Sequence, residues 1–237
     1  MSAKEFFESI TAHGPIFIST LTDILSGPKT FIRKLNFDEK STLGKVLAFN
    51  LSCLAVAFIF QLSFIATTKE LYQVFATLFI FFVLTSFLVA FAYKTGFFAV
   101  GGKASLKNHI IINLYIAGPA YLVSVIISTT SKSILLIEEP DLLPIFKEFV
   151  ANHDQTNPDI YLALYESNPG LLAVALNILG NIAILVWLLY SWGCYRYINN
   201  VSKAKSTIAF VIAMCISIPI SYLLSILRRT LELQIFS

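Results

Sequence analysis

The feature that most constrains the fold is a set of five long windows without Asp, Glu, Lys or Arg. The shortest window holds 22 residues, and the five cover 46–68, 71–93, 108–131, 167–195 and 206–227. A helix of about 20 apolar residues crosses the roughly 30 Å hydrocarbon core of a bilayer. A chain that is 57% hydrophobic, with a mean hydropathy of +0.76, is too apolar for an ordinary soluble domain. The sequence therefore predicts an all-α, polytopic membrane protein with five transmembrane helices.

These windows divide the chain into two regions. Residues 1–45 precede the first span, and residues 46–237 form the predicted membrane domain. The predicted spans cover about 46–67, 71–93, 109–131, 171–192 and 207–227. The one long connection, residues 132–170, holds seven Asp or Glu. Its apolar residues and Asn-Pro pairs predict two short helices within it, at 142–149 and 158–165.

The N-terminal segment has the pattern of one-sided helices. Phe17, Leu21 and Ile24 recur at i, i+4 and i+7, which is the spacing of an amphipathic helix. Gly-Pro pairs at 14–15 and 27–28 punctuate the segment, so we expect two or three short helices. These helices either lie in the membrane interface with basic residues toward the headgroups or pack against the cytoplasmic ends of the spans. The basic residues of the first alternative are Lys29, Arg33 and Lys34.

Positive charge is distributed unequally between the two sides of the predicted membrane domain. Residues 1–45 and the connections after the second and fourth spans hold twelve Lys or Arg, against five on the other side. Short loops rich in Lys and Arg stay in the cytoplasm. We therefore expect a cytoplasmic N-terminus, a C-terminus outside, and an acidic extracytoplasmic loop at 132–170.

Several polar and helix-breaking residues lie inside the predicted spans. Asn113 lies in the third span, whereas Asn177 and Asn181 share one face of the fourth because they are four residues apart. Such asparagines either border a hydrated path or make interhelical hydrogen bonds, which contribute about 0.6 kcal/mol each on average; the second role is the commoner. Pro119 and Pro219 each remove a backbone donor and predict helix kinks that act as hinges or as static packing features.

The sequence offers few groups for catalysis. No Asp, Glu, Lys, Arg or His lies at the middle of a predicted span, which disfavours an ion-coupled transporter. The Gly101-Gly102 turn lacks the spacing of a phosphate-binding loop, so we expect it to present Lys103 and Lys107 to anionic headgroups. We expect no enzymatic activity, no cofactor, no metal site and no nucleic-acid partner. A cation site could form only at the acidic residues after the third span, which are more simply solvated: Glu138, Glu139 and Asp141.

The order of these features resembles the Yip family, five-span membrane proteins first described as partners of Ypt/Rab GTPases. The matching stretches are 24–31 (ILSGPKTF), 101–105 (GGKAS) after the second span, and 115–119 (YIAGP) in the third. In eukaryotic members a D-L-Y-G-P motif precedes the first span, whereas residues 23–28 here are DILSGP, and the long polar N-terminal region of those members is missing. The resemblance therefore implies a bacterial-type, oligomeric inner-membrane protein with no established reaction, and it does not extend to a GTPase partner.

Two functions are compatible with these observations. The first is a non-enzymatic, Yip-like integral membrane protein that organises membrane lipids or protein partners, as a homo-oligomer or with another membrane protein. The second is a channel or uncoupled transporter whose path passes the asparagines and prolines of the third to fifth spans. A pore needs a continuous polar face through the bilayer, whereas a scaffold can have a dry core.

Overall fold

The computed structural model describes the chain except residues 1–2, 65–70, 152–157 and 237, and it leaves undescribed the side chains of 3–13, 63, 71–74, 151, 158–161, 221, 225 and 227–236. Every regular element among the described residues is helical. The elements are α1 Ala3–Ser26, α2 Pro28–Lys34, α3 Ser41–Gln61 followed by a 3-10 turn at Leu62–Phe64, α4 Leu71–Ala99, α5 Leu106–Glu138, α6 Leu142–Ala151, α7 Pro158–Glu166, α8 Asn168–Asn199 and α9 Lys203–Phe236. The predicted all-α class is confirmed.

Five of these helices, α3, α4, α5, α8 and α9, are long and apolar enough to cross a membrane. The five-span prediction is therefore confirmed. The helices extend beyond the apolar windows, because α5 continues to Glu138 and α9 to Phe236. The end of the first predicted span, residues 65–67, lies outside the described residues.

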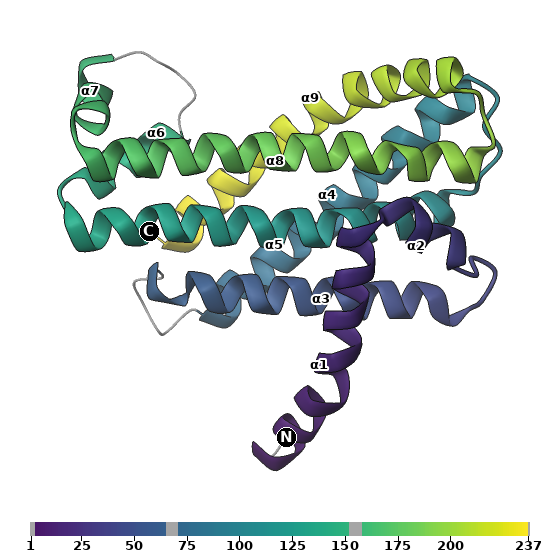
Figure 1. Ribbon diagram of the computed structural model, residues 1–237, viewed down its shortest axis with the longest axis horizontal. Coiled ribbons are helices and arrows are strands. Elements are labelled where there is room, and N and C mark those ends of the chain that lie inside the picture. Colours follow the sequence, from purple (N-terminus) through teal and green to yellow (C-terminus); the bar gives the residue numbers. More distant parts are fainter. Residues whose placement is uncertain (1–2, 65–70, 152–157, 237) are drawn as a thin grey trace.

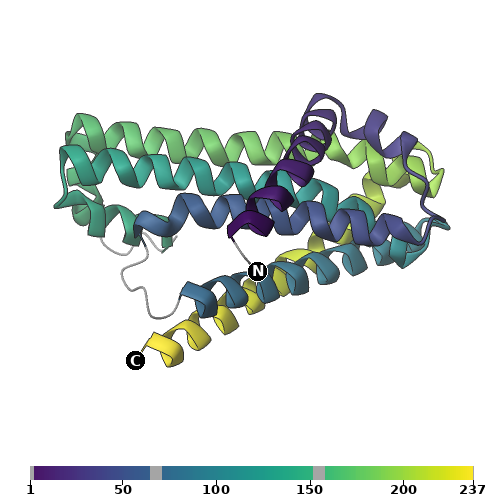
Figure 2. The same ribbon diagram turned by 90° about the horizontal axis from the view of Figure 1, so that it is seen from below.

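The five long helices form two layers. In Figure 1, α3, α5 and α8 run side by side with α5 in the middle, and α4 and α9 cross them obliquely. Figure 2 shows α4 and α9 close to the other helices at one end of the bundle and apart from them at the other. Because α5 contacts α3, α4 and α8, it is the central helix.

The N-terminal segment holds two helices, α1 and α2, within the predicted number of two or three, but α1 is long where short helices were predicted. One helix, α1, runs through Gly14-Pro15 without a break, since Gly14 has no Cβ to clash with the ring of the following proline. Phe17 lies with its ring centroid 5.6 Å from that of Phe49 on α3, and Ile32 on α2 is fully buried. The described part of the segment thus packs against the bundle, where α1 crosses α3 (Figure 1).

The long connection between α5 and α8 folds onto the bundle. The predicted helices at 142–149 and 158–165 are confirmed as α6 and α7, and residues 152–157 between them lie outside the described residues. Leu135, Phe146 and Leu164 form a buried cluster there. The hydroxyl of Ser167 caps α8 by accepting a hydrogen bond from the backbone N–H of Gly170 at 2.9 Å. This connection therefore packs over one end of the α5–α8 pair.

Candidate functional site

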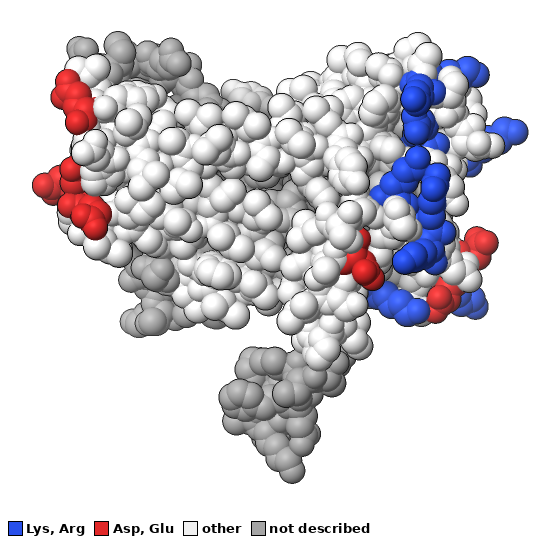
Figure 3. Space-filling view, viewed as in Figure 1, with Lys and Arg blue, Asp and Glu red and all other residues white. Residues whose placement is uncertain are grey.

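Among the described residues, most Lys and Arg lie at one end of the bundle, and most Asp and Glu lie at the other (Figure 3). We call the basic end the one where α4 and α8 end and where α3, α5 and α9 begin. Eleven Lys or Arg of residues 23–205 lie there, against Asp23, Asp38 and Glu39. The opposite, acidic end carries two lysines, Lys132 and Lys147, against five acids of α5, α6, α7 and the connection between α5 and α6: Glu138, Glu139, Asp141, Glu148 and Glu166. This asymmetry makes the basic end the candidate binding surface for anions.

Helix α2 carries part of this surface, and it is held against α8. The guanidinium of Arg33 lies 5.2 Å from the ring centroid of Tyr197, a cation–π contact. Lys29 packs beside Gly193, where a Cβ would lie 3.6 Å from the lysine Cδ. Lys34 is exposed. The predicted headgroup residues of the N-terminal segment are therefore placed on the bundle itself, close to the end of α8.

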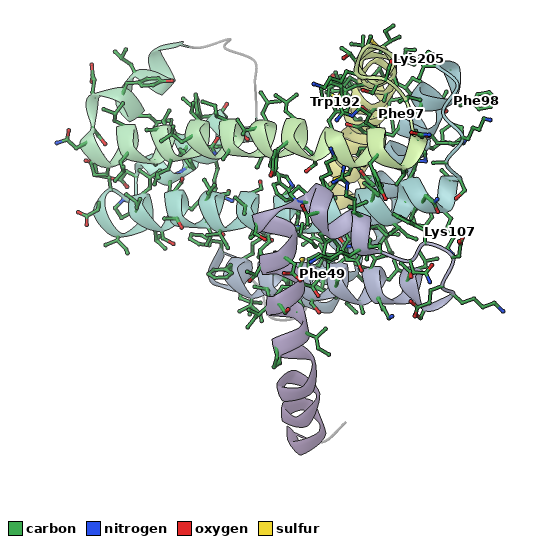
Figure 4. The ribbon with its side chains drawn as sticks, turned by 45° about the vertical axis from the view of Figure 1, so that its right-hand side comes forward. Phe49, Phe97, Phe98, Lys107, Trp192 and Lys205 are labelled. Atoms are coloured by element: carbon green, nitrogen blue, oxygen red, sulfur yellow. The ribbon has the colours of Figure 1, made fainter. Side chains whose placement is uncertain are left out.

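The glycine turn carries the other predicted basic residues, and they have different surroundings. Lys103 is exposed. The Nζ of Lys107 donates to the Phe37 carbonyl at 2.8 Å, so this lysine fastens the α2–α3 connection as well as adding charge. The Nζ of Lys94 likewise donates to the Ala104 carbonyl at 2.7 Å. Figure 4 shows Lys107 and Lys205 at the same end of the bundle.

A buried hydrogen-bonded cluster lies under the glycine turn. The side-chain amide of Asn199 donates to His109 Nε2 at 3.1 Å and to the Tyr195 carbonyl at 2.9 Å, and its oxygen accepts from the Ala104 N–H at 3.2 Å. His109 Nδ1 lies 2.9 Å from the Ser105 carbonyl. A neutral imidazole with its proton on Nδ1 satisfies both contacts. The cluster therefore ties the end of α8 to the start of α5 and to the turn after α4.

Asn113 is part of the same buried layer. Its Nδ2 donates to the Ser86 carbonyl of α4 at 2.9 Å, and its oxygen accepts from the Tyr195 hydroxyl of α8 at 3.1 Å. The Tyr195 ring stacks on Tyr93 with centroids 4.3 Å apart. Asn113 thus links three helices, as interhelical hydrogen bonding predicts.

Asn177 and Asn181 lie elsewhere. Asn181 is exposed, and its Nδ2 donates to Asn177 Oδ1 at 3.1 Å within α8. Gly180 beside them is buried against Ile127 of α5, where a Cβ would come within 2.7 Å of the Ile127 Cδ1. The structure therefore does not bring Asn113, Asn177 and Asn181 onto one polar face.

Both prolines lie within continuous helices, Pro119 in α5 and Pro219 in α9. Pro119 has no N–H, so the Tyr115 carbonyl lacks its usual in-helix donor. Donors from neighbouring helices reach the carbonyls on either side: Asn50 Nδ2 donates to Leu114 at 2.9 Å, and Trp187 Nε1 to Ile116 at 3.1 Å. Pro119 is buried in this packed region, whereas Pro219 is exposed.

Sequence reasoning missed His109, Asn199 and Tyr195 as a cluster. Their partners are 82 to 90 residues apart in the chain, and only the polarity of Asn199 at a helix end could have drawn attention to them. Within the part of the chain that the structure describes, no group of three or more His, Cys, Asp or Glu could hold a metal ion. This includes the acids after the third span, Glu138, Glu139 and Asp141.

Comparison with known proteins adds no relative. No family model, no curated protein and no solved structure matches the chain.

Proposed function

We propose that this chain is a non-enzymatic, Yip-like protein of the bacterial inner membrane, with its basic end in the cytoplasm, where it gathers anionic lipid headgroups and partner proteins. The N-terminus then lies on the cytoplasmic side and the C-terminus outside. The single observation that carries the proposal is the segregation of charge between the two ends of a five-helix bundle. Lys and Arg favour the cytoplasmic side of a membrane protein, and each one near an anionic surface contributes about 1 kcal/mol of binding free energy.

The shape of the basic end supports this role. Arg33, Lys34 and Lys103 come from α2 and from the turn after α4, and all three are exposed. Hydrogen bonds from Lys94 to the Ala104 carbonyl and from Lys107 to the Phe37 carbonyl hold the backbone near these three residues in place. Because the backbone near the exposed cations is held in place, little backbone freedom is lost when they bind headgroup phosphates.

The alternative of a channel or uncoupled transporter has less support. Its path was expected to pass Asn113, Asn177 and Asn181. Asn113 is buried and bonded to two neighbouring helices, whereas Asn181 faces outward from α8. Near the middle of α5, Leu122 and Val125 are buried apolar side chains. We therefore favour a scaffold with a dry core.

A lipid-binding measurement tests the proposal. Delipidated full-length protein in detergent is titrated with phosphatidylglycerol or with phosphatidylcholine, and bound lipid is counted by native mass spectrometry. We expect preferential binding of the anionic lipid, and we expect the Arg33→Gln, Lys34→Gln, Lys103→Gln triple variant to lose most of that preference. Lys147→Gln, an exposed lysine of α6 at the acidic end, serves as the control. Equal binding of the two lipids, or a triple variant that behaves like wild type, contradicts the proposal.

A further inference from the structure

The outward face of α8 is apolar except for one amide pair. Helix α8 packs on α5 along its length, with α2 near its basic end and α7 near its acidic end. The outward side chains of its middle are about half exposed, and they are Ile178 48%, Ile182 51%, Leu185 55% and Leu189 49%. Asn181 is exposed among them, three residues after Ile178 and four before Leu185, so it lies on the same helical face.

The depth of Asn181 places its amide in the hydrocarbon. It lies ten residues from Leu171 and eleven from Trp192, the ends of the predicted span. At 1.5 Å per residue this is about 15 Å from either boundary, near the middle of the bilayer core. Lipid tails offer no hydrogen-bonding groups there, so an unmet amide at this depth is costly.

Contacts within the chain satisfy only part of the hydrogen-bonding capacity of the Asn181 amide. A side-chain amide has two donors and one acceptor oxygen. Asn181 uses one N–H for Asn177, and no other side-chain hydrogen bond of Asn181 is present among the described residues. The second N–H and the oxygen of Asn181 are therefore available to hydrogen-bond with a partner outside the chain.

Rotation of α8 cannot turn this amide inward. Gly180 lies against Ile127, with room for no Cβ. The Trp187 indole donates to the Ile116 carbonyl of α5, and the Tyr195 hydroxyl donates to Asn113. These three contacts lie along one side of α8 and fix its rotational setting. Asn181 is therefore held on the outward face.

We propose that the outward face of α8 binds the same face of a second copy of this chain, with the Asn181 amides pairing across the contact. A second copy inserted the same way carries Asn181 at the same depth, and an amide is both donor and acceptor, so the face is complementary to itself. A two-fold axis along the membrane normal then brings the two α8 helices together in parallel. Interhelical hydrogen bonds between such side chains strengthen association in membranes. This inference names the face of the oligomer in the proposed function and rests on it only for the shared orientation of the copies.

Cysteine crosslinking of the full chain in native membranes tests this contact. In a Cys215→Ser background, Ile182→Cys on α8 is compared with Ile218→Cys, an equally apolar and exposed position on α9. We expect oxidant to link the first variant into disulfide dimers and to leave the second monomeric. Adding Asn181→Leu should lower the dimer yield about threefold or more, and Asn181→Gln should restore much of it.

The outcomes separate this proposal from the others. Asn181→Leu makes α8 more apolar, so a loss of dimer cannot come from failed insertion. Monomeric protein, equal crosslinking from α9, a dimer indifferent to Asn181→Leu, or a different membrane protein linked at residue 182 each overturns the proposal. Lipid binding by the Asn181→Leu variant should equal that of wild type, and the triple Gln variant of the basic end should still crosslink, so failure of one proposal leaves the other readable.

Discussion

The amide of Asn199 donates a hydrogen bond to Nε2 of His109 across 3.1 Å, joining residues that lie 90 positions apart in the chain. Both side chains are buried, His109 fully. Because Asn199 also accepts a hydrogen bond from the Ala104 N–H, a single side chain links the end of α8 to the start of α5 and to the glycine turn. This contact holds in place the turn that carries the exposed Lys103.

Asn199→Leu should destabilise the fold. The substitution leaves His109 Nε2 and the Ala104 N–H buried without their partner, and each such group costs about 1–3 kcal/mol. The measurement is thermal unfolding of purified protein in detergent. Asn168→Leu is the matched control, since it removes the same group from an exposed position of the same helix. Equal melting temperatures for Asn199→Leu and wild type would contradict the role given to this cluster.

Gly96→Ala should separate α4 from α9. A Cβ on Gly96 would lie 2.3 Å from the Ala209 carbonyl oxygen, a backbone atom that cannot move alone, so the two helices must shift. We expect a lower melting temperature. Gly44→Ala in α3 meets nothing within 4 Å and should be neutral or slightly stabilising, because alanine favours helix over glycine by about 1 kcal/mol. The account is wrong here if the two variants have the same stability.

Tyr195→Phe isolates one hydrogen bond from the aromatic stack. The ring can keep its contact with Tyr93, but Asn113 Oδ1 loses its donor. We expect a loss of about 1–3 kcal/mol in the free energy of unfolding. Tyr190→Phe changes the same group on an exposed ring and should have little effect. A Tyr195→Phe variant as stable as Tyr190→Phe would show that the bond contributes nothing.

Glu39 makes one contact of the basic end dependent on pH. Hydrogen bonds from Lys45, at 2.9 Å, and from Ser41, together with the positive charge of Lys45, lower the pKa of the Glu39 carboxyl. A carboxyl whose folded pKa is lowered stabilises the fold at neutral pH and loses this effect as pH falls through that pKa. Glu39→Gln should therefore be less stable than wild type at neutral pH and equal to it at acid pH. A difference that is constant with pH contradicts this account.

Some parts of this structure follow from the sequence, and others depend on how helices pair. The five long helices were predictable because charge-free runs of this length have no other stable form in a bilayer. The continuous α1 was not, since a Gly-Pro pair usually marks a break, whereas Gly14 has no Cβ to clash with the Pro15 ring and stays helical here. The extent of α5 and α9 beyond the apolar windows was also missed, because charged residues continue a helix once it has left the hydrocarbon.

The roles of the asparagines could not be read from the sequence. Asn113 and Asn181 look alike there, as amides within apolar runs. Their difference comes from the rotational setting of each helix, which Gly180 and Trp187 fix through contacts with α5. Spacing placed Asn177 and Asn181 on one face correctly, but it could not say that Asn181 faces outward.

Binding of cytoplasmic headgroups depends most directly on the orientation of the bundle, with its basic end in the cytoplasm. Labelling of single cysteines in intact cells measures this orientation. In a Cys215→Ser background, Ala204→Cys at the basic end is compared with Glu166→Cys at the acidic end, both exposed. Neither change alters the number of Lys or Arg that set the topology. We predict that a membrane-impermeant maleimide labels residue 166 in intact cells and residue 204 only after the membrane is opened. Labelling of residue 204 from outside would contradict the account.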